Sequence, residues 1–213
     1  MTNALFPQNA DPVKVYWFPL SGHAHRAQLM LSLLDIPHKL IPVDLANGEH
    51  KTPDYLNKLH PFGLVPVIDD NGVIIWESNA ILTYLATKYD SDRTWLPTEP
   101  VKAAHVQQWL ALASGMIING PGAARLVKVF GTDHDHDKCL QVSKDLFDVL
   151  EGLLKDRTFT TGEAPTIADV SAYSYVAHAP EGHVDLAPYP TIQKWIKAVE
   201  ALPNFVAMKK TET

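Results

Sequence analysis

Apolar residues of this 213-residue chain follow one pattern before residue 90 and another after residue 100. In the first part, short β-rich runs alternate with stretches whose apolar residues recur at helical spacing, which is typical of βα units. The pattern predicts strands at 13–18, 39–43, 65–68 and 73–75 and helices at 24–34, 53–59 and 78–89. We therefore expect an α/β domain with the element order βαβαββα.

Helical spacing alone continues through the second part of the chain. Helices are expected at 102–130, 138–154, 166–179 and 191–202, with breaks or kinks at Gly115 and at residues 120–122. Residues 90–100 are rich in turn-forming and charged residues, which predicts a linker. The expected domains are an N-terminal extension (1–12), an α/β domain (13–90), a linker (91–99) and an all-α helical bundle (100–213).

Composition and charge narrow the function classes. The formal net charge is −6 and the pI about 5.9, which argues against nucleic acid as a partner, because such proteins need a basic face. No apolar run approaches the roughly 20 residues that span a bilayer, and the N-terminus lacks the layout of a signal peptide. A single cysteine excludes an intrachain disulfide framework and any CxxC redox or zinc motif. We expect a cytoplasmic protein with no membrane contact and no metal.

The dipeptide Val65-Pro66 predicts a backbone edge that can bind a peptide. Proline cannot donate a hydrogen bond to a sheet, so Pro66 is expected at the first residue of its strand. The residue before a proline is driven to an extended conformation, which leaves the N–H and C=O groups of Val65 ready to pair with an added strand. A turn at residues 60–63 precedes this pair and permits a cis peptide bond.

Glu77 and Ser78 begin the helix that follows the hairpin. The free N–H groups and positive dipole end of a helix N-terminus suit a carboxylate, and Ser78 adds a hydroxyl group. Glu77 adds a negative charge that can pair with an amine. Together with Val65, these residues predict a site for the amino-acid end of a small peptide. The alternative is that Ser78 only caps the helix and Glu77 is a solvated acid.

The stretch from His60 to Pro66, read together with Glu77-Ser78, resembles the N-P-x-G-x-V-P and E-S elements of cytosolic glutathione transferases. The resemblance extends over about residues 13–205. It implies a thioredoxin-like N-terminal domain followed by a helical domain, with glutathione as co-substrate and an apolar electrophile as second substrate. It also implies a homodimer and a role in detoxification.

Ser21 lies in the turn between the first predicted strand and helix, where this family places the group that hydrogen-bonds the glutathione sulfur. The surrounding residues resemble bacterial-type enzymes with a serine-type active site, similar to the phi and theta classes. A free thiol has a pKa of about 8.5, so a donated hydrogen bond and a helix N-terminus are needed to favour the thiolate. His23 is the second catalytic candidate. The alternative for Ser21 is that it only caps the helix.

The resemblance also assigns the loop at Gly48–Lys51, where His50 and Lys51 would bind the glycine carboxylate of glutathione. The alternative is a solvated charged loop. His60 replaces the usual Asn of the family pattern, and Leu64 stands where serine-type relatives often have Gln or Lys. Residues 132–137 alternate Asp and His, and we interpret them as a solvated loop rather than a metal site.

The helical half offers two further expectations. Thr166 and Asp169 have capping-box spacing, with Asp in place of Glu or Gln, so Asp169 is expected to be buried, hydrogen-bonded to its own helix start and structural. Residues that could line an apolar pocket for a second substrate are Trp109, Met116, Ile117, Phe130 and Tyr173.

The sequence thus predicts a transferase in which the glutathione thiolate attacks an electrophilic carbon. A glutathione-dependent peroxidase or disulfide reductase remains an alternative, since it would use the same thiolate. Two further alternatives are a non-catalytic binding module of this fold and an isomerase or dehalogenase that acts on one metabolite.

Overall fold

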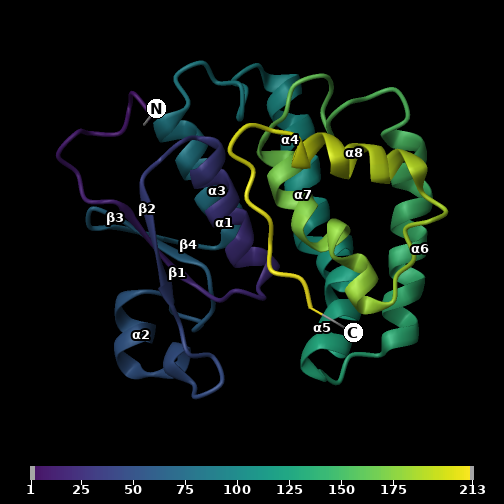
Figure 1. Cartoon of the computed structure of the whole chain (residues 1–213), viewed down its shortest axis with the longest axis horizontal. Helices are drawn as coiled ribbons and strands as arrows, with labels where there is room; N and C mark the ends of the chain where they lie inside the picture. The colour runs from purple at the N-terminus through teal and green to yellow at the C-terminus, as the bar shows by residue number, and fades with distance from the viewer. Residues whose placement is uncertain (1–2, 212–213) are drawn as a thin grey trace. The chain divides into compact units, whose positions relative to one another are not determined.

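The computed structural model describes residues 3–211, and the chain folds into two compact units. Unit 1 contains Met1–Arg93 and Pro203–Lys209, and unit 2 contains Thr94–Leu202 and Lys210–Thr213. The four strands labelled in Figure 1 all belong to unit 1, whereas unit 2 is built from helices.

Unit 1 has the predicted order βαβαββα. Its elements are β1 (Val13–Trp17), α1 (Gly22–Leu33), β2 (His38–Pro42), the short 3₁₀ turn η1 (Glu49–Lys51), α2 (Pro53–Lys58), β3 (Val67–Asp70), β4 (Val73–Trp76) and α3 (Ser78–Tyr89). The sheet order is β2-β1-β3-β4, with β2 parallel to β1 and both β1–β3 and β3–β4 antiparallel. This is the thioredoxin-like arrangement that the sequence predicted.

The core of unit 1 lies on both faces of this sheet. Helices α1 and α3 pack side by side (Figure 1), and α1 buries Leu29, Met30 and Leu31 completely. A separate cluster of Val43, Tyr55 and Val67 joins α2 to the sheet. Strand β3 begins at Val67, one residue after the predicted first residue Pro66, which has no N–H group to donate to the ladder.

Two segments outside the predicted domain, near Asn3 and near Val206, contact residues of unit 1. The side chain of Asn3 donates hydrogen bonds to the carbonyl oxygens of Leu34 and Tyr89, at 2.8 and 3.0 Å. After the last helix, Val206 O lies 2.8 Å from the ring Nε2 of His25 on α1. Residues on either side of the predicted domain therefore add to its surface.

Unit 2 contains α4 (Pro100–Leu112), the π-helical segment η2 (Ala113–Gly122), α5 (Ala123–Phe130), α6 (His136–Leu153), α7 (Ile167–Ala177), η3 (Ala179–Gly182) and α8 (Pro190–Glu200). The all-α prediction is confirmed. Helix α6 illustrates why, because its buried residues recur at helical spacing. They are Cys139, Ser143, Leu146, Phe147 and Leu150.

The break or kink predicted at Gly115 and residues 120–122 takes the form of a π-helical stretch, and the helix does not end there. Segments α4, η2 and α5 form one continuous helix from Pro100 to Phe130, with Pro121 inside it. Proline removes one main-chain donor, and a π-helical register accommodates this local loss without ending the helix.

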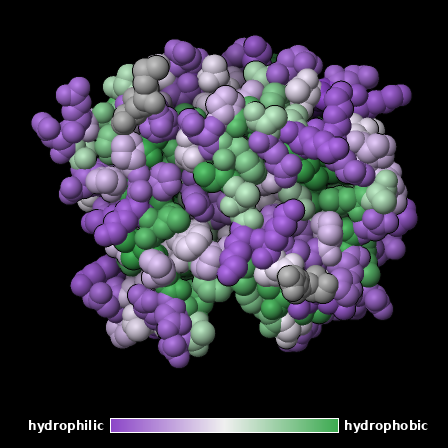
Figure 2. Space-filling view, in the orientation of Figure 1, coloured by the Kyte–Doolittle hydropathy of each residue, from purple (hydrophilic) through white to green (hydrophobic). Residues whose placement is uncertain are grey.

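Among residues 3–211, this is the one helix that is long and apolar enough to cross a membrane, judged by length and composition alone. Half of its most apolar window is buried inside the fold, as in the core helix of a soluble protein, so it is weak support for a membrane span. The face shown in Figure 2 mixes many hydrophilic side chains with scattered apolar ones.

Candidate functional site

Ser21 caps helix α1. It has an extended backbone (φ −89°, ψ 114°), and its Oγ accepts a hydrogen bond from the Ala24 N–H at 3.1 Å. Ser21 is therefore the N-cap of α1. This capping bond occupies only an acceptor lone pair of the Ser21 hydroxyl. The hydroxyl proton is not consumed by this bond, so capping and donation to a ligand are compatible.

His23, Arg26 and Ser78 form a compact hydrogen-bonded group in unit 1. Arg26 Nη1 lies 2.9 Å from His23 Nδ1 and 3.1 Å from Ser78 Oγ, and His23 Nδ1 lies 3.2 Å from Ser78 Oγ. Burial, assisted by the Arg26 charge, lowers the pKa of His23 to about 3. The ring is therefore neutral near pH 7 and cannot act as a cation beside a thiolate.

A small cleft of about 70 Å³ gathers most of the predicted binding residues of unit 1. Its lining comprises His23, His60, Leu64, Val65, Pro66, Glu77 and Ser78. The lining does not include Ser21, His50 or Lys51. The cleft thus joins the start of α1, the segment before β3 and the start of α3, which lie far apart in the sequence.

Val65 presents an open backbone edge to this cleft. The Val65-Pro66 peptide bond is cis, and Val65 precedes the first residue of β3. Among the described residues, no hydrogen bond engages the main-chain N–H or C=O of Val65. Both groups can therefore pair with the backbone of a peptide ligand, as an added strand does.

Glu77, rather than Ser78, is the N-cap of α3. Its side chain makes no capping hydrogen bond and is exposed, and its backbone has a positive φ of 69°. A sparsely populated backbone conformation of a non-glycine residue costs on the order of 1–3 kcal/mol, and such strain recurs at ligand-binding sites. Ser78 is the first helical residue and is only 4% exposed. The interpretation of Ser78 as a simple cap is therefore wrong.

His50 and Lys51 support the turn that leads to Val65. Lys51 Nζ donates to the carbonyl oxygens of Phe62 and Gly63, at 2.8 and 2.9 Å. Gly63 has a φ of 61°, and a Cβ there would come within 2.3 Å of His50 O. The loop at Gly48–Lys51 and the turn at residues 60–63 are thus packed against each other, and a side chain at position 63 would separate them.

The His50 ring is half-buried in this arrangement. Its Nδ1 is buried and has no hydrogen-bond partner among the described residues. Burial and the neighbouring Lys51 charge lower its pKa.

His60, the departure from the family pattern, has a structural place in the turn. It is 1% exposed, and its Nδ1 accepts from the Phe62 N–H at 3.2 Å. Its ring lies 5.0 Å from that of Trp76, centroid to centroid. His60 therefore stabilises this turn as a hydrogen-bond acceptor.

Arg26 is the site residue that sequence reasoning missed. It is fully buried, although α1 is otherwise dominated by apolar residues such as Ala27, Leu29 and Leu31. A charged residue within an apolar helical stretch was the available signal, because arginine is rarely fully buried without a specific partner.

Residues 132–135 form the loop predicted before α6, and His136 and Asp137 are the first residues of the helix. Asp135 is its N-cap, and Oδ1 accepts from the Lys138 N–H at 3.1 Å. Within residues 3–211, no group of three or more His, Cys, Asp or Glu side chains is placed to hold a metal ion.

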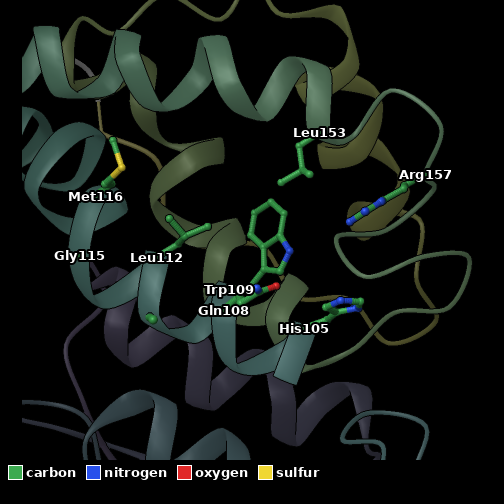
Figure 3. A pocket seen from close by; sticks show the side chains of 9 residues that line it. His105, Gln108, Trp109, Leu112, Gly115, Met116, Leu153 and Arg157 are labelled. Atoms are coloured by element: carbon green, nitrogen blue, oxygen red, sulfur yellow. The ribbon is translucent and has the colours of Figure 1, made fainter. Parts of the chain in front are cut away.

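Unit 2 has its own cavity of about 670 Å³, shown in Figure 3. It brings together Trp109 and Met116, two of the residues expected to line an apolar pocket, with Leu112 and Leu153 beside them. Ile117 and Tyr173 are instead buried in the core, and Phe130 is exposed outside the lining.

Comparisons with known proteins agree with this architecture. The chain matches the glutathione S-transferase N-terminal domain over residues 20–88 and the glutathione S-transferase C-terminal domain over residues 121–203. It is 31% identical to glutathione S-transferase 3 of Zea mays over 206 residues, which cover 91% of each chain.

Solved structures give the same result. A glutathione S-transferase from Pseudomonas fluorescens Pf-5 superposes with a TM-score of 0.87 and 32% identity, covering 94% of this chain and all of that one. A glutathione transferase homologue from Drosophila mojavensis with bound glutathione has a TM-score of 0.81 and 30% identity, covering 90% of this chain and 89% of that one.

Proposed function

Because this chain belongs to the glutathione S-transferase family, we propose that it activates the glutathione thiolate for attack on an electrophilic carbon of an apolar compound. The observation that carries the proposal is the cleft of unit 1. It combines the open backbone edge of Val65, the strained Glu77 and the buried hydroxyl of Ser78.

Glutathione has matching groups at each of these points. In the proposed pose its backbone pairs with the N–H and C=O of Val65, beside Pro66. Its γ-glutamyl carboxylate meets Ser78 and the N-terminus of α3, and its ammonium group meets Glu77. Its glycine carboxylate lies near His50 and Lys51.

The sulfur is assigned to Ser21, which makes this a serine-type enzyme similar to the phi and theta classes. The thiol loses its proton to solvent, and the Ser21 hydroxyl and the N-terminus of α1 stabilise the resulting anion. The thiolate then forms a bond to carbon while the leaving group departs with its electron pair. Ser21 donates a hydrogen bond throughout and is not itself a nucleophile.

The second substrate belongs to the helical domain in this proposal. Residues 13–90 are the glutathione-binding domain, 91–99 the linker and 100–213 the domain that supplies the electrophile pocket. The cavity at Trp109 and Met116 is the candidate in unit 2, since its volume of about 670 Å³ falls in the usual range for small-molecule sites.

Two activity assays run side by side test the reaction class. We expect conjugation of an aryl halide to glutathione, measured by absorbance, to exceed reduction of an organic peroxide, measured by glutathione oxidation. Calorimetric titration with glutathione supplies the binding control. Faster peroxide turnover would assign the thiolate to the peroxidase alternative, and an absence of glutathione binding would favour the non-catalytic module.

We further propose that the protein is a cytoplasmic homodimer that acts in detoxification. The family resemblance supports the dimer, and unit 1 exposes apolar side chains that a partner could cover, among them Phe62 (66% exposed) and Leu64 (50%). Light scattering should give twice the 23.6 kDa of one chain. A mass of one chain at micromolar concentration would contradict the dimer, and cell fractionation tests the location.

A further inference from the structure

Arg26 is placed to control how the cleft presents its hydrogen-bond donors. It is fully buried on α1, and a single nitrogen, Nη1, contacts both His23 Nδ1 and Ser78 Oγ, at 2.9 and 3.1 Å. His23 and Ser78 line the cleft, whereas Arg26 is not part of its lining. Arg26 can therefore affect a ligand in the cleft only through His23 and Ser78, which it contacts.

The contact with Arg26 determines the His23 tautomer. A guanidinium group carries only donors, so His23 Nδ1 must be the acceptor of this bond. A ring nitrogen has one lone pair in the ring plane, and Arg26 occupies it. The imidazole proton is therefore on Nε2, and the low pKa of His23 keeps the ring in this neutral form.

The same contact orients the hydroxyl of Ser78. Ser78 Oγ accepts from Arg26, and the neighbouring acceptor, His23 Nδ1, is already bound by the shorter and charge-assisted Arg26 contact. The Ser78 proton is therefore available for donation into the cleft. A carboxylate accepts hydrogen bonds and donates none, so it matches this arrangement.

We propose that Arg26 is a positioning residue for the γ-glutamyl carboxylate of glutathione: it fixes the Ser78 hydroxyl as a donor and His23 as the Nε2–H tautomer without touching the ligand. The inference rests on the proposed function, and it gives His23 a place in carboxylate recognition rather than beside the sulfur. It predicts a selective defect in Arg26 variants, confined to ligands that carry this carboxylate.

Three ligands separate that defect from general damage. Glutathione carries both the carboxylate and the amine, glutaryl-cysteinyl-glycine keeps only the carboxylate, and 4-aminobutyryl-cysteinyl-glycine keeps only the amine. Calorimetry should show that Arg26→Gln lowers the affinity for glutathione and for glutaryl-cysteinyl-glycine by roughly tenfold or more. This is the effect of losing one hydrogen bond to a charged group. The affinity for 4-aminobutyryl-cysteinyl-glycine should change less than about twofold, because this ligand lacks the carboxylate that Ser78 binds.

A matched control and a conservative variant accompany this test. Tyr89→Phe removes another buried polar group of unit 1, the hydroxyl that donates to Asp70 Oδ2 at 2.7 Å, and should leave the ranking of the three ligands unchanged. Arg26→Lys keeps the charge and should restore part of the carboxylate preference. If Arg26→Gln does not fold, Arg26→Lys replaces it in the calorimetric test.

Nitrogen NMR of the wild-type protein without ligand gives an independent readout. We expect the His23 ring to show an unprotonated Nδ1 and a protonated Nε2 at neutral pH, with that pattern altered in Arg26→Gln and retained in Arg26→Lys, which still carries only donors. The opposite tautomer in the wild type would overturn the inference.

The calorimetric outcomes distinguish the positioning role from the proposed function. Suppose that the wild type binds glutathione but an Arg26 variant lowers the affinity for all three ligands equally, or for none of them. The positioning role is then wrong and the proposed function stands. If the wild type binds none of the three ligands, the proposed function is wrong and the inference falls with it.

Discussion

Ser21→Ala should lower kcat/KM for conjugation by about 10- to 100-fold and move the acidic limb of its pH profile to higher pH. In the proposed mechanism the hydroxyl donates to a thiolate, and such a charge-assisted hydrogen bond contributes about 1.5–3 kcal/mol. Without it the bound thiol has a higher pKa, so less thiolate is present at neutral pH. Steady-state rates across pH, together with ultraviolet titration of the bound thiol, measure both effects.

The capping role of Ser21 must be separated from its chemistry. Losing the bond from the Ala24 N–H should destabilise the fold by about 1 kcal/mol, as for other N-caps. Asp135→Ala removes a comparable cap, on α6, and should cost similar stability while leaving kcat/KM unchanged. Full activity and an unshifted thiol titration in Ser21→Ala would exclude Ser21 from the mechanism.

Asp169→Ala should produce the largest loss of stability, about 3–5 kcal/mol, because it leaves buried donors without an acceptor. Asp169 is fully buried. Its carboxylate accepts from the main-chain N–H groups of Thr160 and Thr166, at 2.7 and 2.8 Å, and from the Trp195 indole at 2.9 Å. One side chain thus links the loop before α7, the start of α7 and helix α8.

Thermal unfolding followed by circular dichroism measures this loss. For a chain of this length each kcal/mol corresponds to about 2–4 °C, so we expect the apparent Tm to fall by roughly 10 °C or more. Glu99→Ala is the matched control, since Glu99 caps α4 through two main-chain N–H groups but is exposed, and it should cost only about 1 kcal/mol. A similar Tm for both variants would show that burial adds little to the Asp169 network.

The sequence predicted the local features of the candidate site well. The special backbone at Val65-Pro66 follows from the proline ring, which acts on its immediate neighbour wherever it occurs. The capping box of Thr166 and Asp169 was likewise predicted, because both members belong to one helical turn. Such features depend on residues a few positions apart, so the order of residue types is enough to define them.

Other features needed the tertiary structure. Ser78 was assigned a possible capping role, but Glu77 takes the cap position with a strained backbone that no residue pattern announces. A break or kink was expected near Pro121, and the helix continues there through a π-helical stretch, because packing in unit 2 stabilises a register that proline alone disfavours.

By itself, then, the sequence determined the element order, the two classes of domain and the exposed backbone edge at Val65, since these follow from periodicity, turns and proline. Only the tertiary structure brought Arg26 to Ser78 across 52 positions and Lys51 to the turn at Gly63. The physical reason is that a hydrogen bond acts over about 3 Å in space, whatever the separation along the chain. Which distant donors and acceptors meet is decided by the packing of the elements that carry them.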